Sequence, residues 1–242
     1  MTKSYWGKLA RELVEQLNLQ DPPLAISFTD EPPEGVPRYE AEMPEPTSDG
    51  RTGKVAAGCV FWMKAGKSTF ATVGEDHANC SVGSVTHGFK TLEDVGANED
   101  VAALLESGWA TMDTVLQLPV VKNRYKYVTY GPLAETKIEP DVVFFRLNAK
   151  QLMILHDALP ELRFEGKPQC HIVAIAKEQR QVAVSVGCML SRVRTGMQNG
   201  ELTCAIPSDK LPDVVDKLGT TCAADISVAA YAARDAKRFA VQ

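Results

Sequence analysis

The chain has 242 residues, of which 45% are hydrophobic and 24% are charged, and its formal net charge is −5. These proportions are those of an ordinary globular protein that can bury a substantial core. The acidic balance argues against a dedicated nucleic-acid-binding protein, which would present a basic face. No apolar run approaches the roughly 18 residues that a bilayer span needs, and the N-terminal residues lack the apolar core of a signal peptide. We therefore expect a cytoplasmic protein whose partners include neither nucleic acid nor membrane.

The elements expected from the sequence alternate between helix and strand. In chain order, the patterns predict a helix over residues 4–19, a strand over 24–28, a proline-rich surface loop over 29–53, a helix over 55–65, a strand over 70–73 and a short helix over 81–87. Helices follow over 99–107 and 111–118, then strands over 125–130 and 140–147, and a helix over 149–159. The last part predicts an apolar helix near Cys170, a strand over 182–186, a helix after Cys188, a strand over 202–207, and helices over 209–218 and 223–239.

Two stretches of the chain resemble each other weakly. Residues 53–84 and residues 166–196 both begin with Gly-Lys, continue with a helix that carries an early cysteine, and pass through a polar turn into a short strand. A second cysteine stands at or just beyond the end of each strand. The spacing between the two cysteines is 21 residues in the first stretch (Cys59 to Cys80) and 18 in the second (Cys170 to Cys188). This similarity predicts a duplicated fold with the four cysteines in one site.

The order of elements predicts the fold class. In each half the expected order is a strand, then a loop or a helix, then a further helix, a strand, a cysteine and a final helix. This order favours an α/β to mixed α+β fold. We expect a single domain over 1–242, built from two pseudo-symmetric halves over about 20–135 and 136–220, with a C-terminal helix over 221–242.

The cysteines are the residues that suggest chemistry. Thiolates are soft ligands that suit iron–sulfur clusters, zinc or copper(I). Cys80 and Cys188 stand where helices begin, and a helix N-terminus lowers the pKa of a thiol. Four thiolates from two equivalent loops suit a four-cysteine cluster, although no CxxC pair is present. The plain alternative is that these residues, like Cys204 and Cys222 outside the repeat, are small buried side chains.

Other polar residues near the cysteines are weaker candidates. His77 is three residues from Cys80, and His171 adjoins Cys170, so either is a candidate ligand or proton donor. Arg192 and Arg194 follow Cys188 and are candidates for holding an anion, but such charges more often face solvent. The sequence contains no dinucleotide-binding glycine fingerprint, P-loop, HExxH, GxSxG or EF-hand motif.

These residues together resemble the DUF169 family, an uncharacterised group. The resemblance covers about residues 8–218 and rests on the strand over 23–27, the first cysteine helix ending at Ala65-Gly66, and Cys80 followed by Gly83 and 87–89. It continues through the Cys170 helix, residues 184–188 and 205–207. Members of the family have cysteines resembling Cys59, Cys80, Cys170 and Cys188, which implies a four-cysteine set. The resemblance implies no activity.

Three functions remain open at this point. The first is an iron–sulfur protein, with a [4Fe–4S] cluster on the four cysteines and zinc or haem as alternative cofactors. It would act as an oxidoreductase or lyase on a small-molecule substrate, or with an electron-transfer partner. The second is a metal-free enzyme that uses Cys188 or Cys80 as a thiolate nucleophile. The third is a non-enzymatic sensor or binding module with a pocket between the halves. The sequence leaves open whether the chain forms a homo-oligomer.

Overall fold

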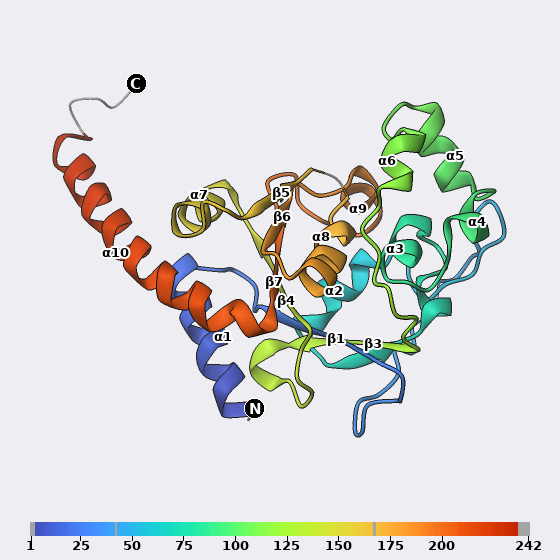
Figure 1. The fold of residues 1–242 in the computed structure, drawn as a ribbon, viewed down its shortest axis with the longest axis horizontal. Coiled ribbons are helices and arrows are strands. Elements are labelled where there is room, and N and C mark those ends of the chain that lie inside the picture. Colours follow the sequence, from blue (N-terminus) through green and yellow to red (C-terminus); the bar gives the residue numbers. More distant parts are fainter. Residues whose placement is uncertain (1–2, 42, 167, 237–242) are drawn as a thin grey trace.

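The computed structural model describes residues 3–41, 43–166 and 168–236, and a single seven-stranded sheet organises this part of the chain (Figure 1). Its strands are β1 (Leu24–Thr29), β2 (Phe70–Thr72), β3 (Tyr127–Pro132), β4 (Val142–Leu147), β5 (Arg163–Glu165), β6 (Ala183–Ser185) and β7 (Leu202–Pro207). They lie in the order β2-β3-β1-β4-β7-β6-β5. All neighbouring strands are antiparallel except β5 and β6, which are parallel. The mixed α/β class expected from the sequence is confirmed.

The strand order reads alike on both sides of the central pair. From β1 outward come β3 and β2, and from β4 outward come β7 and β6, with β5 added at that edge. The central pair is antiparallel, with Ala25 opposite Val143. This order is what a pseudo-twofold axis between β1 and β4 would require. The relation itself stays a prediction.

Helices cover both faces of the sheet. They are α1 (Lys3–Leu17), α2 (Cys59–Ala65), α3 (Ser81–Thr86), α4 (Leu92–Val95), α5 (Glu99–Glu106), α6 (Met112–Leu116), α7 (Ala149–Ala158), α8 (Cys170–Ala174), α9 (Met189–Arg194) and α10 (Leu211–Asp235). One core is formed by α1, α7 and α10 against one face, and the other by α2 and α8 against the opposite face. Successive β4 residues alternate between them, since Val143 and Phe145 belong to the first core and Val142 and Phe144 to the second. Burial on both faces explains why residues 142–145 of this strand are all apolar.

Several expected boundaries are wrong. Helix α2 begins at Cys59 instead of residue 55, and β3 lies two residues beyond the predicted 125–130. The short elements α4 and β5 had not been predicted. The last two predicted helices are one continuous helix, α10, so the C-terminal helix begins well before residue 221 and contains Cys222. Gly219 lies inside this helix, at a place where a Cβ atom would come within 3.2 Å of Gln16 Nε2.

None of the helices in the described part of the chain combines the length and the hydropathy that a membrane span requires.

Candidate functional site

Four helix starts carry the four cysteines of the repeat. Cys59 and Cys170 are the first residues of α2 and α8, and Cys80 and Cys188 are the N-cap residues of α3 and α9. All four line one small cavity of about 20 Å³. The rest of its wall consists of Ala57, Val82, Leu104, Trp109, Pro168, Gln169, Leu190 and Ser191. The structure thus brings together cysteines that are up to 129 positions apart, 188 minus 59.

The four cysteines lie around a cavity and do not converge on the position of a single metal ion. Among the described residues, no group of three or more His, Cys, Asp or Glu side chains is placed as the ligands of one metal ion would be. A tetrahedral zinc ion with bonds of about 2.3 Å needs its sulfur ligands about 3.8 Å from one another. Whether the cysteines ligate a metal stays a prediction.

Burial favours the protonated thiol at three of these cysteines, Cys59, Cys80 and Cys170. It raises the pKa of Cys59 and of Cys170, and the charges of the neighbouring thiols raise both pKa values further. Burial also raises the pKa of Cys80 to about 11, although Gly83 N–H hydrogen-bonds to its sulfur. The expected lowering of this pKa by the start of α3 is therefore wrong, because desolvation outweighs the helix N-terminus.

The N–H groups of Gly83 and Gln169 hydrogen-bond to cysteine sulfurs. The backbone N–H of Gly83 lies 3.4 Å from Cys80 Sγ, and Gln169 Nε2 lies 3.3 Å from Cys59 Sγ. A Cβ atom at Gly83 would come within 3.2 Å of the Cys80 sulfur, so the missing side chain permits this approach. Gln169 is 1% exposed, and sequence reasoning missed it. Only its position beside Cys170 could have drawn attention to it.

The two candidate histidines lie outside the cysteine cavity. His77 is buried in an aromatic layer, 4.7 Å from the Phe61 ring and 5.5 Å from the His87 ring between centroids. Thr72 Oγ1 donates to Val128 O, so it accepts from His77 Nε2–H. His171 is also buried, and its Nδ1 lies 3.3 Å from Glu165 Oε1. Its ring contributes to the wall of a neighbouring cavity.

The two candidate arginines have different surroundings. Arg192 Nη2 donates to the backbone oxygens of Val186 and Glu201, both at 2.9 Å, and thereby ties the chain before α9 to the chain after it. Arg194 lines an outer cleft of about 410 Å³ together with Arg51. The cleft is separated from the cysteine cavity by residues that line both: Leu104, Trp109 and Leu190.

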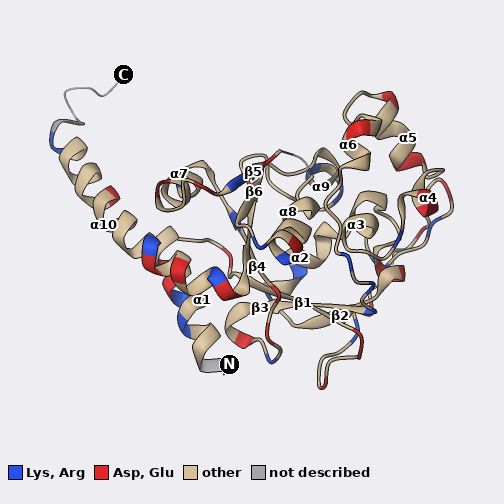
Figure 2. Ribbon diagram, viewed as in Figure 1, with Lys and Arg blue, Asp and Glu red and all other residues tan. Residues whose placement is uncertain are grey.

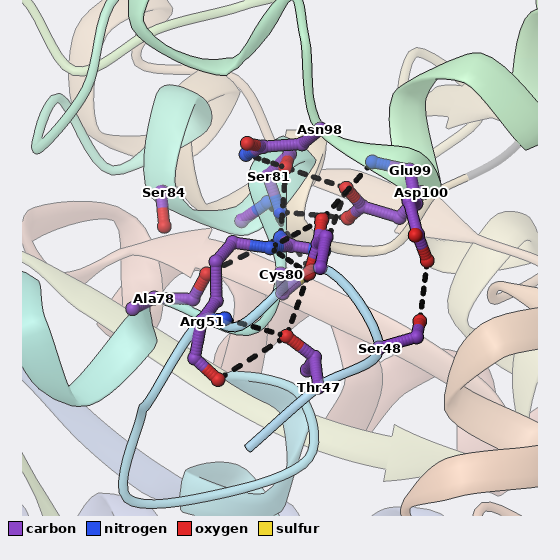
Figure 3. A network of polar contacts seen from close by, with 12 residues as sticks. Thr47, Ser48, Arg51, Ala78, Cys80, Ser81, Ser84, Asn98, Glu99 and Asp100 are labelled. Carbon is purple, nitrogen blue, oxygen red and sulfur yellow. Dashed lines mark hydrogen bonds and ion pairs between the residues drawn. The ribbon is translucent and has the colours of Figure 1, made fainter.

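A buried polar network fixes the proline-rich loop beside Cys80 (Figure 3). Ser81, the first residue of α3, donates its N–H and its hydroxyl to the Asp100 carboxylate at 3.0 and 2.7 Å. Arg51, from the loop, forms ion pairs with Asp100 at 3.2 Å and with Asp49 at 2.9 Å. The sequence predicted a surface loop over 29–53, but no motif marked Arg51 or Asp100. The negative charge of Asp100 is one cause of the raised pKa of Cys80.

Comparison with known proteins gives one result. The model of the DUF169 family, described as “Uncharacterised ArCR”, matches residues 12–217, a range that contains all four cavity cysteines. No curated protein and no solved structure matches the chain.

Proposed function

This chain belongs to the DUF169 family, and we propose that it is an iron–sulfur protein whose cluster is held by Cys59, Cys80, Cys170 and Cys188. The observation that carries the proposal is the convergence of these four thiols on one cavity from four separate helix starts. Cys59 and Cys80 come from the chain between β1 and β3, and Cys170 and Cys188 come from the chain between β4 and β7. A four-iron cluster takes one thiolate on each iron, so its ligands surround a volume, as these cysteines do.

The charge balance of the cavity supports a metal. Its described lining contains no lysine or arginine, so among these residues four thiolates would have no cationic partner. Uncompensated buried charge is costly, and the raised pKa values of Cys59, Cys80 and Cys170 express that cost. Iron supplies the positive charge that makes deprotonation of the thiols favourable. The N–H groups of Gly83 and Gln169 would then remain as hydrogen-bond donors to ligand sulfur, which is one means of tuning a cluster.

The size of the cavity adds a requirement. A volume of about 20 Å³ has room for about one water molecule. We therefore expect cluster binding to turn the thiols and to displace Leu104, Trp109 and Leu190, which separate the cavity from the outer cleft. Bound there, a cluster supplies one-electron chemistry or an iron that polarises a small substrate. The chain would accordingly act as an oxidoreductase or lyase, or transfer electrons to a partner.

One observation bears on the metal-free thiolate enzyme. A nucleophilic thiol needs a pKa near or below the ambient pH, whereas that of Cys80 is about 11. This weighs against Cys80 as a nucleophile. The sensor or binding module gains support from an apolar cavity beside the cysteines, which the next subsection describes.

The test is to purify the chain without oxygen and to measure iron, acid-labile sulfide and the visible spectrum on one sample. We expect about four irons and four sulfides per chain, with the broad absorption of thiolate-to-iron charge transfer. Replacing any one of the four cysteines by serine should lower the iron content and alter the spectrum. Matched controls are Cys204→Ser and Cys222→Ser, because neither residue lines the cavity.

Two outcomes would contradict the proposal. One is a colourless protein that holds neither iron nor sulfide even after anaerobic reconstitution. The other is a cluster that is lost equally in the control variants and in the cavity variants.

A further inference from the structure

A larger cavity of about 280 Å³ adjoins the cysteine cavity. It lies between the inner helix α3 and the segment that carries α4, α5 and α6, residues 92–116. The two cavities share four wall residues: Val82, Leu104, Trp109 and Pro168. Anything bound in the larger cavity would thus be separated from the cysteines by a single layer of side chains.

The helices that cover this cavity have little core of their own. Helix α6 contains no buried residue, and the exposed fractions of Met112 and Leu116 are 55% and 68%. Asp100 is the only buried residue of α5, and Val95 the only one of α4. Figure 1 shows these helices grouped at the end of the molecule opposite the tip of α10. Their apolar side chains, including Leu105 and Val115, line the cavity instead of packing against the sheet.

The lining is apolar and uncharged apart from one residue. Among the described residues of the wall, only His171 is ionisable, and Ser81 and Thr114 carry hydroxyls. The Ser81 hydroxyl is already engaged with Asp100. His171 Nδ1–H donates to the Glu165 carboxylate, so Nε2 carries no proton and can accept a hydrogen bond. This buried Nε2 has no hydrogen-bond partner within the described part of the chain.

We propose that this cavity binds an uncharged small molecule that is largely hydrocarbon and carries a hydroxyl or N–H group that donates to His171 Nε2. The cavity exceeds the engineered cavities of about 150 Å³ that bind benzene. Among the described residues of the wall none offers a charged ligand a counter-ion, so we expect an uncharged one. Binding of this molecule does not depend on the proposed cluster. Only its assignment as the substrate rests on that cluster.

The test is isothermal titration calorimetry on the whole chain with 1-naphthol, an aromatic alcohol smaller than the cavity. We expect one site with a dissociation constant on the order of 100 µM. Naphthalene, which lacks the donor, should bind several-fold more weakly, and 1-naphthalenesulfonate at least about tenfold more weakly. Absence of 1-naphthol binding, or equal affinity for the alcohol and the sulfonate, would overturn the inference. This comparison uses the unmodified protein and does not depend on any variant folding.

Two pairs of measurements locate the site. Ala110→Trp fills the cavity from the segment between α5 and α6 and should abolish binding, whereas Ala102→Trp, at an exposed position of α5 outside the cavity wall, should leave it unchanged. His171→Phe should reduce the affinity for 1-naphthol to that for naphthalene. Unchanged affinity in the Ala110 variant would place the ligand elsewhere and overturn the proposal.

Repeating the titration on iron-loaded and iron-free protein separates the two proposals. Binding that shifts the visible spectrum of the loaded protein supports the substrate role. Binding to a protein that never acquires iron sustains the ligand site and contradicts only the cluster. A loaded protein that fails to bind 1-naphthol overturns the ligand site and leaves the cluster in place.

Discussion

At the scale of single residues, burial decides the ionisation of the groups around the site. Cys80 has the position at a helix start that favours a thiolate, yet its pKa rises to about 11 because the sulfur is desolvated. His87 shows the same effect on a base. Its ring is buried against Phe28, His77 and Phe89, and burial lowers its pKa to about 4. The position of a group along a helix indicates whether its charged form is favoured. Burial by the surrounding side chains determines the free-energy cost of that charge.

The lowered pKa of His87 predicts a loss of stability in mild acid. The unfolded chain binds a proton at this residue below its ordinary pKa of about 6.5, whereas the folded chain does so only near pH 4. The stabilisation is thus fully present above pH 6.5 and is lost as the pH falls toward 4. Between pH 7 and pH 5 we expect the free energy of unfolding to fall by about 2 kcal/mol through this group, and urea denaturation at the two pH values measures it.

The control for this prediction is a pair of variants. His87→Gln should reduce the pH dependence, while His156→Gln, at an exposed position, should leave it as in the unmodified chain. Because His77 is also buried and its pKa is also lowered, His87→Gln should not remove the dependence entirely. Identical pH profiles for His87→Gln and the unmodified chain would show that His87 does not titrate as described.

At the scale of elements, the loop between β1 and α2 depends on long-range polar contacts. Its described residues form no helix or strand apart from one bridge between Arg38 and Ala71. The ion pair between Arg51 and Asp100 joins it to α5, and the Asp100 carboxylate also accepts the N–H of Ser81 at the start of α3. Helices α3 and α8 contain no Lys, Arg, Asp or Glu, and Figure 2 shows α3 in tan throughout, in contrast to the charged network beside it. The loop thus acts as a wall of the outer cleft.

Removing Arg51 should release this loop and destabilise the protein. The Asp100 side chain is only 2% exposed, so Arg51→Leu leaves a buried carboxylate without its cationic partner. We expect a loss of about 2 kcal/mol in the free energy of unfolding, together with faster cleavage within 29–53 by a protease. Urea denaturation and limited proteolysis measure the two effects.

Glu45→Gln is the control in the same loop. Glu45 is exposed, so this change should alter the free energy of unfolding by less than about 0.5 kcal/mol. If both variants lose the same stability and are cleaved at the same rate, the Arg51 network has no special role in holding the loop.

At the scale of the whole molecule, the central pair β1–β4 joins two groups of elements that each supply two cysteines. Helices α2 and α8 pack on the same face of the sheet, in one shared core. Helices α1, α7 and α10 cover the other face, away from the four cysteines of the cavity. The second core therefore holds the site, while the first core supports the sheet that positions it.

The end of α10 should be dispensable for this arrangement. Ile226, Val228 and Tyr231 are 66–69% exposed, and Figure 1 shows the helix extending away from the body. Deleting residues 226–242 should change the free energy of unfolding by less than about 1 kcal/mol and leave any iron content unaltered. Thermal denaturation and iron analysis of the shortened chain test this expectation.

Deleting the whole helix from Leu211 is the contrasting control. This deletion removes Leu211, Val214, Val215 and Leu218 from the first core, and each large buried side chain contributes about 2–5 kcal/mol. The chain should then fail to fold. A large loss of stability from the shorter deletion would mean that the exposed end of α10 has a structural role.

The sequence by itself determined the class of fold and the set of cysteines. Apolar runs such as 142–145 indicate strands because a sheet buried on both faces requires them. The similar order of elements around Cys59–Cys80 and Cys170–Cys188 grouped four of the six cysteines. These are local patterns, so a single chain displays them without any knowledge of distant neighbours.

Only the tertiary structure decided which other residues surround the cysteines and how they are charged. Gln169 donates to Cys59 across 110 positions, and Asp100 reaches Ser81 across 19, contacts that no periodicity encodes. His77 and His171 are near cysteines in sequence, yet their side chains lie outside the cysteine cavity. The direction of a pKa shift depends on desolvation by elements from both halves, and that burial exists only once the sheet has brought them together.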